Sequence, residues 1–229
     1  MQISLSPAEF RLAAGVLGIA ELPSIPDPHR GWLMSEVEQS MLQATVMLVR
    51  AKLANVDGQS LQLSEPLKQF LLQLVHISNA VVIEVKGNKS ISTMCGYYQT
   101  YGAPGGIFVR QSGVNMLTLE HIDVATMVTR VLAHTGVEQT PPAAARPPFQ
   151  MAAHNINRML EPNKAAKFLA RAVDISVWQQ EVRMRYRIMY VQNQWWMSQL
   201  VGDDYRFEPY QPGYLGWLLT TQCGIVSAV

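Results

Sequence analysis

The spacing of apolar residues predicts three helices in the first third of the chain. The first follows the capping box Ser6-Pro7-Ala8-Glu9 and ends near Gly18. A second runs from Ser35 to about Ala54, because one apolar stripe recurs there at helical intervals: Leu42, Val46, Val49 and Leu53. A third begins at Glu65-Pro66 and has the inward spacing Leu67, Phe70, Leu71 and Leu74.

From Ala80 the pattern changes to that of β-strands. We expect strands at residues 80–86, 90–100, 107–110 and 116–120, with a turn at 87–89. Residues 102–106 read Gly-Ala-Pro-Gly-Gly, which predicts a loop without regular structure. Asp123 is placed to cap a helix that ends at Gly136.

The same order of elements returns after a segment rich in Pro and Ala at residues 137–148. The pattern predicts a short helix to about Leu160, a helix from Pro162, strands at 175–190, 194–199 and 205–208, and a closing helix from about Tyr214. We therefore expect two helix–meander–helix units, residues 1–136 and 149–229, joined by a linker at 137–148.

Two stretches support an internal repeat. Residues 70–78 (FLLQLVHIS) and 168–176 (FLARAVDIS) share five of nine positions without a gap. Glu65-Pro66 likewise corresponds to Glu161-Pro162, and Glu84-Val85-Lys86 to Glu181-Val182-Arg183. The predicted fold is α+β and internally duplicated, with a pseudo-twofold central antiparallel sheet and helical bundles outside it.

Composition points to a surface with few charges. Charged residues make up 15% of the chain, hydrophobic residues 48%, and there are 12 methionines. This balance suits a protein that spends its time against a partner, although methionine also fills gaps in cores. The net charge of +1 provides no overall attraction for nucleic acid or for an anionic membrane.

Other features concern the compartment. The two cysteines, Cys95 and Cys223, do not make a disulfide framework, so a reducing compartment is expected. The N-terminus has neither a basic segment nor a long apolar run, and the uncharged tail after Glu208 is broken by Pro209 and Pro212. We expect a cytoplasmic protein without a membrane span.

No motif predicts catalysis. Residues 87–90 (GNKS) resemble the end of a phosphate-binding loop, but a strand follows where a helix is required. Cys95 would need an activating base such as His76 or His121, and nothing in the sequence brings these together. The five histidines show no metal-ligand spacing. We expect a non-enzymatic protein with no cofactor and no metal.

Three features could bind a partner. Arg183, Arg185 and Arg187 alternate along a strand, so their guanidinium groups share a face that could hold phosphate or an acidic partner, or could be salt-bridged. Trp195 belongs to a Trp-Trp pair that is either an interface or core. Tyr101 and Pro104 lie in the Gly- and Pro-rich loop.

Helices that precede a hairpin in each unit leave a second interpretation open, a DNA-binding regulator with tandem winged-helix-like units. The helix at 66–76 has Lys68 as its only Lys or Arg and is a poor recognition helix, whereas the helix from Pro162 carries Lys164, Lys167 and Arg171. Nucleic acid therefore remains the less favoured partner.

The duplicated plan, carried by residues 65–123 and 161–221 and including the hairpin Trp195-Trp196-Met197 before Gly202-Asp203-Asp204, resembles the EspG family of cytosolic chaperones for type VII (ESX) secretion. The resemblance implies a pseudo-twofold fold with a central sheet and two helical bundles. It also implies a non-enzymatic role, in which the protein binds the exposed hydrophobic tip of a helical secretion substrate. The loop that would contact this substrate is Tyr101–Gly106.

Overall fold

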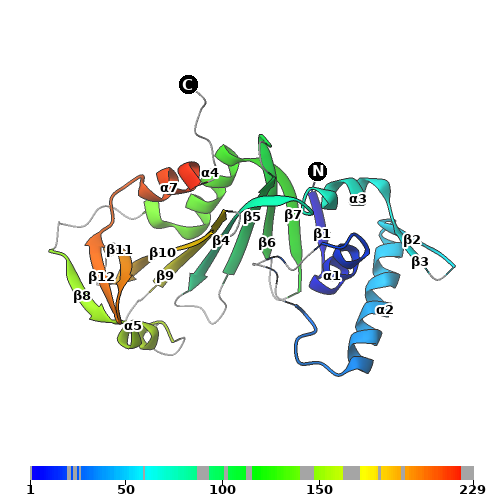
Figure 1. The fold of residues 1–229 in the computed structure, drawn as a ribbon, viewed down its shortest axis with the longest axis horizontal. Coiled ribbons are helices and arrows are strands. Elements are labelled where there is room, and N and C mark those ends of the chain that lie inside the picture. Colours follow the sequence, from blue (N-terminus) through cyan, green and yellow to red (C-terminus); the bar gives the residue numbers. More distant parts are fainter. Residues whose placement is uncertain are drawn as a thin grey trace. The chain divides into compact units, whose positions relative to one another are not determined.

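The computed structural model describes residues 2–19, 22, 25, 27–58, 60–86, 93–100, 103–111, 115–139, 147–161, 171–179, 182–191 and 194–222. They form an α+β fold with a ten-stranded antiparallel sheet in the order β1-β7-β6-β5-β4-β9-β10-β11-β12-β8 (Figure 1). The predicted fold class, α+β with a central antiparallel sheet, is confirmed. The chain divides into two compact units, one of residues 1–78 and 96–122 and one of residues 79–95 and 123–229.

Unit 1 contains three helices among its described residues and most of the N-terminal strands. The helices are α1 (Pro7–Val16), α2 (Met34–Arg50) and α3 (Glu65–Leu72). The strands are β1 (Gln2–Leu5), β5 (Thr93–Thr100) from Gly96 onward, β6 (Gly105–Gln111) and β7 (Leu117–Asp123) up to Ile122. A separate hairpin consists of β2 (Ala54–Asp57) and β3 (Ser60–Leu63).

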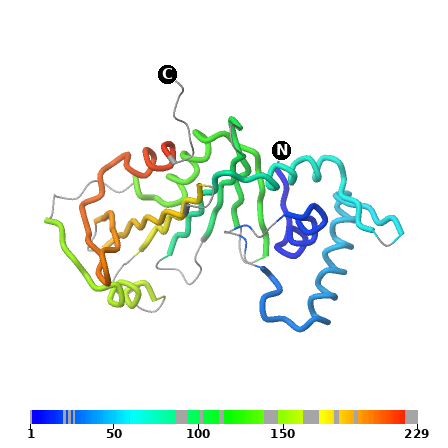
Figure 2. The backbone as a smooth tube through the Cα atoms, viewed as in Figure 1, coloured from blue at the N-terminus to red at the C-terminus, as the bar shows by residue number. Residues whose placement is uncertain are grey.

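The predicted cap of α1 and the predicted inward face of α3 are both present. Ser6 and Glu9 make the predicted capping box, in which Glu9 N–H donates to the Ser6 hydroxyl over 3.2 Å and Ser6 N–H donates to the Glu9 carboxylate over 2.6 Å. The inward face of α3 is also as predicted, since Leu67, Phe70 and Leu71 are buried. Figure 2 shows α2 as one continuous helix that leads into the β2–β3 hairpin.

The glycines before β6 do not lie in an irregular loop. Gly105 and Gly106 are the first two residues of β6, so the prediction that 102–106 lacks regular structure is wrong for this pair. A Cβ on Gly106 would lie 2.3 Å from the Tyr98 carbonyl oxygen, and one on Gly105 would lie 2.7 Å from that of Ile122. The glycines are there because neighbouring backbone passes too close for any side chain.

Unit 2 contains the C-terminal strands and the remaining described helices. Its strands are β4 (Ile77–Lys86), β9 (Arg171–Gln179), β10 (Val182–Val191), β11 (Gln194–Val201), β12 (Asp204–Pro209) and β8 (Phe149–Ala152). Its helices are α4 (Val124–Thr135), the short 3-10 turn η1 (Val137–Gln139), α5 (Ala153–Met159) and α7 (Tyr214–Gln222). As predicted, Asp123 caps α4 and Gly136 ends it with φ of 66°.

The two faces of the unit 2 sheet are covered differently. Helices α4 and α7 pack together on one face, where the Gly216 position lies close to Leu132 and Val128 (Figure 1). On the other face, α5 closes a smaller core around the largest buried side chain of β11, Trp196. This core contains Ile156, Ala172, Met189, Val191, Trp196 and Phe207.

Three strand segments were missed because they are short. β1 and β8 have four residues each. The β2–β3 hairpin begins at Ala54, where the preceding helix was expected to end, and α2 itself ends at Arg50.

A tandem winged-helix plan does not describe this fold, because the predicted wings are strands of one wide sheet. The turn at 87–90 and the helix from Pro162 lie outside the described residues.

The order of elements in the two halves agrees with a duplication, because each has four successive strands followed by a helix, β4 to β7 with α4 and β9 to β12 with α7. The first strands of the two sets, β4 and β9, pair antiparallel. One proposed match is wrong, since Glu84-Val85-Lys86 ends a first strand whereas Val182-Arg183 begins a second strand. Residues 162–170 of the repeat and 140–146 of the linker lie outside the described residues, so the duplication and its boundaries stay a prediction.

Candidate partner-binding surfaces

The predicted contact loop joins β5 to β6, and its two ends are held by hydrogen bonds. The Gln99 side-chain amide donates to the Ala103 carbonyl over 2.8 Å, and the Thr100 hydroxyl donates to the Gln73 carbonyl over 3.2 Å. Gln99 is 7% exposed, so its amide fixes the loop from inside the protein. Pro104 is exposed at the end of this loop, whereas Tyr101 lies outside the described residues.

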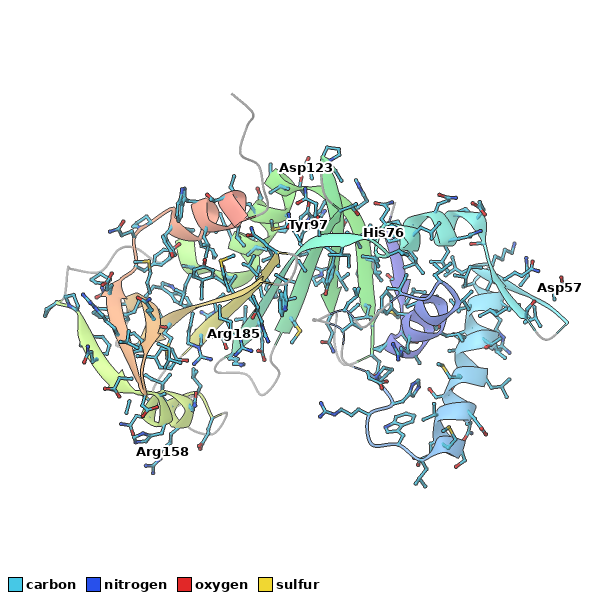
Figure 3. The ribbon with its side chains drawn as sticks, viewed as in Figure 1. Asp57, His76, Tyr97, Asp123, Arg158 and Arg185 are labelled. Carbon is cyan, nitrogen blue, oxygen red and sulfur yellow. The ribbon has the colours of Figure 1, made fainter. Side chains whose placement is uncertain are left out.

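The three arginines of β10 share the α5 side of the sheet, as their alternation predicts. Arg183 and Arg185 are exposed, and Figure 3 shows Arg185 on the side of the sheet away from α7. The Arg183 guanidinium lies 4.6 Å from the centre of the Trp178 ring, at the position that pairs with it on β9. Burial and then the charge of Arg185 lower the pKa of Arg183. These two cations form an accessible pair.

Arg187 has a different environment. Its guanidinium donates to both oxygens of Asp174 and to the Tyr205 hydroxyl over 3.2 Å, and it lies 5.3 Å from the Tyr205 ring centre. Burial alone would lower the pKa of Arg187, but the hydrogen bonds and charge of Asp174 raise it above its ordinary value. The salt-bridged alternative is confirmed for Arg187, while Arg183 and Arg185 keep the exposure that binding requires.

Trp195 and Trp196 both belong to the interior. They are 5% and 1% exposed, and they lie on opposite faces of β11 because they are consecutive strand residues. The Trp195 ring lies 5.2 Å from that of Tyr190 and beside the Arg171 guanidinium. Of the two interpretations of this pair, core is the one the structure supports, because both faces of the sheet are covered here.

A surface that sequence reasoning missed lies in unit 1, which contains a cavity of about 540 Å³ next to α2. Its wall combines exposed apolar side chains, uncharged polar groups and one acidic residue, Glu9. Trp32 is 51% exposed, Met47 45% and Met116 43%, and Ser40, Gln43 and Asn115 complete much of the lining. The signal was the run Trp32-Leu33-Met34, three exposed apolar residues in a row before a helix.

Cys95 is buried, and the described residues contain no metal-binding cluster. Among them no group of three His, Cys, Asp or Glu side chains could hold a metal ion. Cys95 is 2% exposed and does not line the unit 1 cavity. In the part of the chain that is described, no helix has the length and apolar character needed to cross a bilayer.

No protein-family model matches this chain, and no curated protein matches it in sequence. Among solved structures, the fold is similar to that of EspG5, the Mycobacterium tuberculosis type VII secretion system chaperone, in its complex with the PE25–PPE41 dimer. The TM-score is 0.57 over 97% of this chain and 96% of EspG5, with 11% sequence identity. The likeness is therefore one of fold, and it extends over the whole of both chains.

Proposed function

We propose that this protein is a non-enzymatic, chaperone-like binding protein that keeps an apolar helical segment of a protein partner in solution. The observation that carries the proposal is the likeness in fold to EspG5 over 97% of this chain. The same likeness supports the proposal of a role in type VII secretion, with a partner of the PE–PPE kind and a cytoplasmic location.

The surface properties support a protein partner. The unit 1 cavity offers apolar side chains of adaptable shape, Met47 and Met116, beside the flat ring of Trp32. Methionine and tryptophan suit this purpose because one adapts to a partner and the other contributes a large rigid contact. The uncharged polar side chains Ser40, Gln43 and Asn115 around them can donate and accept hydrogen bonds that orient the partner.

The β5–β6 loop and the exposed arginines are further proposed contacts. Pro104 is exposed at the end of this loop, next to Ala103, whose carbonyl accepts a hydrogen bond from the Gln99 side chain. Arg183 and Arg185 would meet acidic groups of the partner. Tyr101, from the same loop, remains part of the proposal, whereas Trp195 and Arg187 would act only by supporting the sheet.

The test is co-expression with a PE–PPE pair from the same genome, followed by size-exclusion chromatography and calorimetry. We expect a stable complex that Met116→Glu weakens at least about tenfold, since a charge would enter an apolar contact. Arg206→Ala is the control, because Arg206 is exposed, does not line the unit 1 cavity and forms an ion pair with its neighbour Glu208. Failure of every such pair to co-purify would overturn the proposal.

The DNA-binding alternative has its own measurement. It requires DNA binding that weakens with salt and is lost in Arg183→Ala with Arg185→Ala. We expect no retardation of duplex DNA even at low salt, and retardation abolished by this double variant would favour the alternative.

A further inference from the structure

Helix α2 is apolar on two opposite sides. One side packs into unit 1 and buries Ala44 and Leu48. The other carries the stripe that predicted the helix, and the structure leaves it in contact with solvent: Leu42 is 67% exposed, Val46 42% and Val49 37%. An amphipathic helix at a protein surface normally presents polar residues there. The outward stripe therefore needs an explanation other than the fold of unit 1.

The spacing of this stripe is that of a helix–helix seam. Leu42, Val46 and Val49 are separated by four and three residues, and the same 4-3 alternation continues backwards to Gln39 and Ser35. Such a 3.5-residue repeat places every member along one line that faces a second helix. A second helix fits this line of side chains, and the charges beside the stripe decide which helix it is.

The charges beside the stripe identify which helix fits. On one flank, Glu36 lies near the beginning of α2 and Arg50 at its end. Glu38 lies on the other flank, and Lys52 follows the C-cap Ala51 with a left-handed backbone, φ 58°. All four side chains are exposed. The acidic pair and the basic pair lie about a helix length apart, roughly 20 Å at 1.5 Å per residue.

We propose that α2 is a self-association surface, on which the α2 of a second copy of this chain packs antiparallel. In this register Leu42 of one copy faces Val46 of the other. In an antiparallel helix pair, each flank of one helix meets the same flank of the other. Glu36 would therefore lie near Arg50 of the second copy, and Glu38 near its Lys52. Twofold symmetry forms each of these ion pairs twice. A parallel pair would instead bring together the acidic ends of both helices, which is unfavourable.

Residues next to the helix extend the same surface. Leu33 and Met34 are 70% and 74% exposed at its beginning, and Val56 is 56% exposed in the hairpin that follows its end. Antiparallel packing would place the beginning of one α2 near the end of the other. There these side chains would add apolar area, because the interface between two helices alone is small. The stripe faces away from Ala44, which lines the unit 1 cavity.

The test uses sedimentation equilibrium of the full chain. We expect a concentration-dependent dimer that Val46→Asp converts to monomer, with an unchanged circular dichroism spectrum because Val46 is already exposed. Lys68→Glu, an exposed charge reversal on α3, should dimerise like the wild type. A wild-type chain that stays monomeric at its highest attainable concentration, or a Val46→Asp chain that still dimerises, would overturn the proposal.

Charge reversal tests the antiparallel register. The variant with Glu36→Lys and Glu38→Lys and the variant with Arg50→Glu and Lys52→Glu should each dimerise about tenfold or more weakly than the wild type, whereas their equimolar mixture should recover dimer. Because the Glu36 carboxylate also accepts a hydrogen bond from Leu33 N–H over 2.8 Å, Glu36→Gln controls for loss of this cap. Dimerisation of either reversed variant at wild-type strength would contradict the register.

Discussion

The carboxylate of Asp174 on β9 accepts hydrogen bonds on both oxygens from the guanidinium of Arg187, the residue directly opposite on β10. Lys86 on β4 donates to the same carboxylate over 3.0 Å and to Glu84 over 2.9 Å. The Asp174 and Arg187 side chains are only 19% and 17% exposed. The network thus joins three neighbouring strands of unit 2 on the face that carries the exposed arginines.

Removing one member of this network should destabilise unit 2. Arg187→Met keeps most of the side-chain length but leaves the mostly buried Asp174 carboxylate with Lys86 as its remaining cationic partner among the described residues. We expect the free energy of unfolding in urea to fall by about 2–3 kcal/mol. Arg185→Met is the matched control on the same face, and because Arg185 is exposed its effect should stay within about 0.5 kcal/mol. Equal effects would contradict the structural role of Arg187.

The same pair predicts a dependence of stability on acid. Burial of Asp174 would raise its pKa, but the hydrogen bonds and charge of Arg187, and then of Lys86, hold its pKa below the ordinary value. The stabilisation is present above the ordinary carboxyl pKa of about 3.9 and is lost as the pH falls through the lower, folded-state pKa. Unfolding measured from about pH 6 down to about pH 2 should show a shallower acid loss for Asp174→Asn than for the wild type. Identical slopes would contradict this prediction.

The sequence predicted elements that local residues determine. The capping box at Ser6, the cap at Asp123 and the left-handed Gly136 lie where expected because their hydrogen bonds join residues close together in the chain. The box expected at Ser35 is wrong, since α2 begins at Met34 and Glu36 bonds back to Leu33. The short strand β1 could not be predicted in the same way. It exists because Ile3 and Leu5 pair with Leu119 and Leu117 of β7, which lie far away in sequence.

The candidate surfaces show where sequence reasoning fails. The alternation of arginines predicted a shared face correctly, but the partner that distinguishes Arg187 from Arg185 is Asp174 on another strand. The stripe at Leu42 was recognised as helical, yet its period is the same whether it faces a core or solvent. Which side of α2 is buried depends on the packing of α1, with which it makes its main contact.

Gly106 should tolerate no side chain. In Gly106→Ala the new Cβ would lie 2.3 Å from the Tyr98 carbonyl oxygen and 2.9 Å from the Tyr97 ring, so the backbone of β6 must shift. We expect a loss of about 2 kcal/mol or more in the free energy of unfolding. Gly15→Ala is the opposite case, because its Cβ meets nothing within 4 Å in helix α1 and helix propensity should then stabilise the protein by up to about 1 kcal/mol. The two variants can be compared in one urea series, and a Gly106→Ala chain as stable as the wild type would contradict the observed approach of strands.

Tyr210 joins η1 to the beginning of α7. Its hydroxyl donates to the Glu138 carboxylate and accepts from Leu215 N–H over 3.0 Å, while Gly213 N–H donates to Glu138 over 3.1 Å. Burial, and then the hydrogen bond to Glu138, raise the pKa of Tyr210 above its ordinary value. The Tyr210 hydroxyl therefore caps the first turn of α7 by accepting from Leu215 N–H.

Tyr210→Phe removes both bonds of the hydroxyl and leaves Leu215 N–H without its acceptor at the start of α7. We expect a loss of about 1–2 kcal/mol in the free energy of unfolding, together with faster amide hydrogen exchange at Leu215 than in the wild type. Tyr214→Phe, which removes a hydroxyl from the neighbouring ring, is the matched control and should leave exchange at Leu215 unchanged. Because the folded-state pKa of Tyr210 is raised, its hydrogen bonds stabilise the protein fully below the ordinary tyrosine pKa of about 10 and are lost only at higher pH. The difference in the free energy of unfolding between wild type and Tyr210→Phe should therefore stay constant through neutral pH. A difference that appears only in alkali would contradict this assignment.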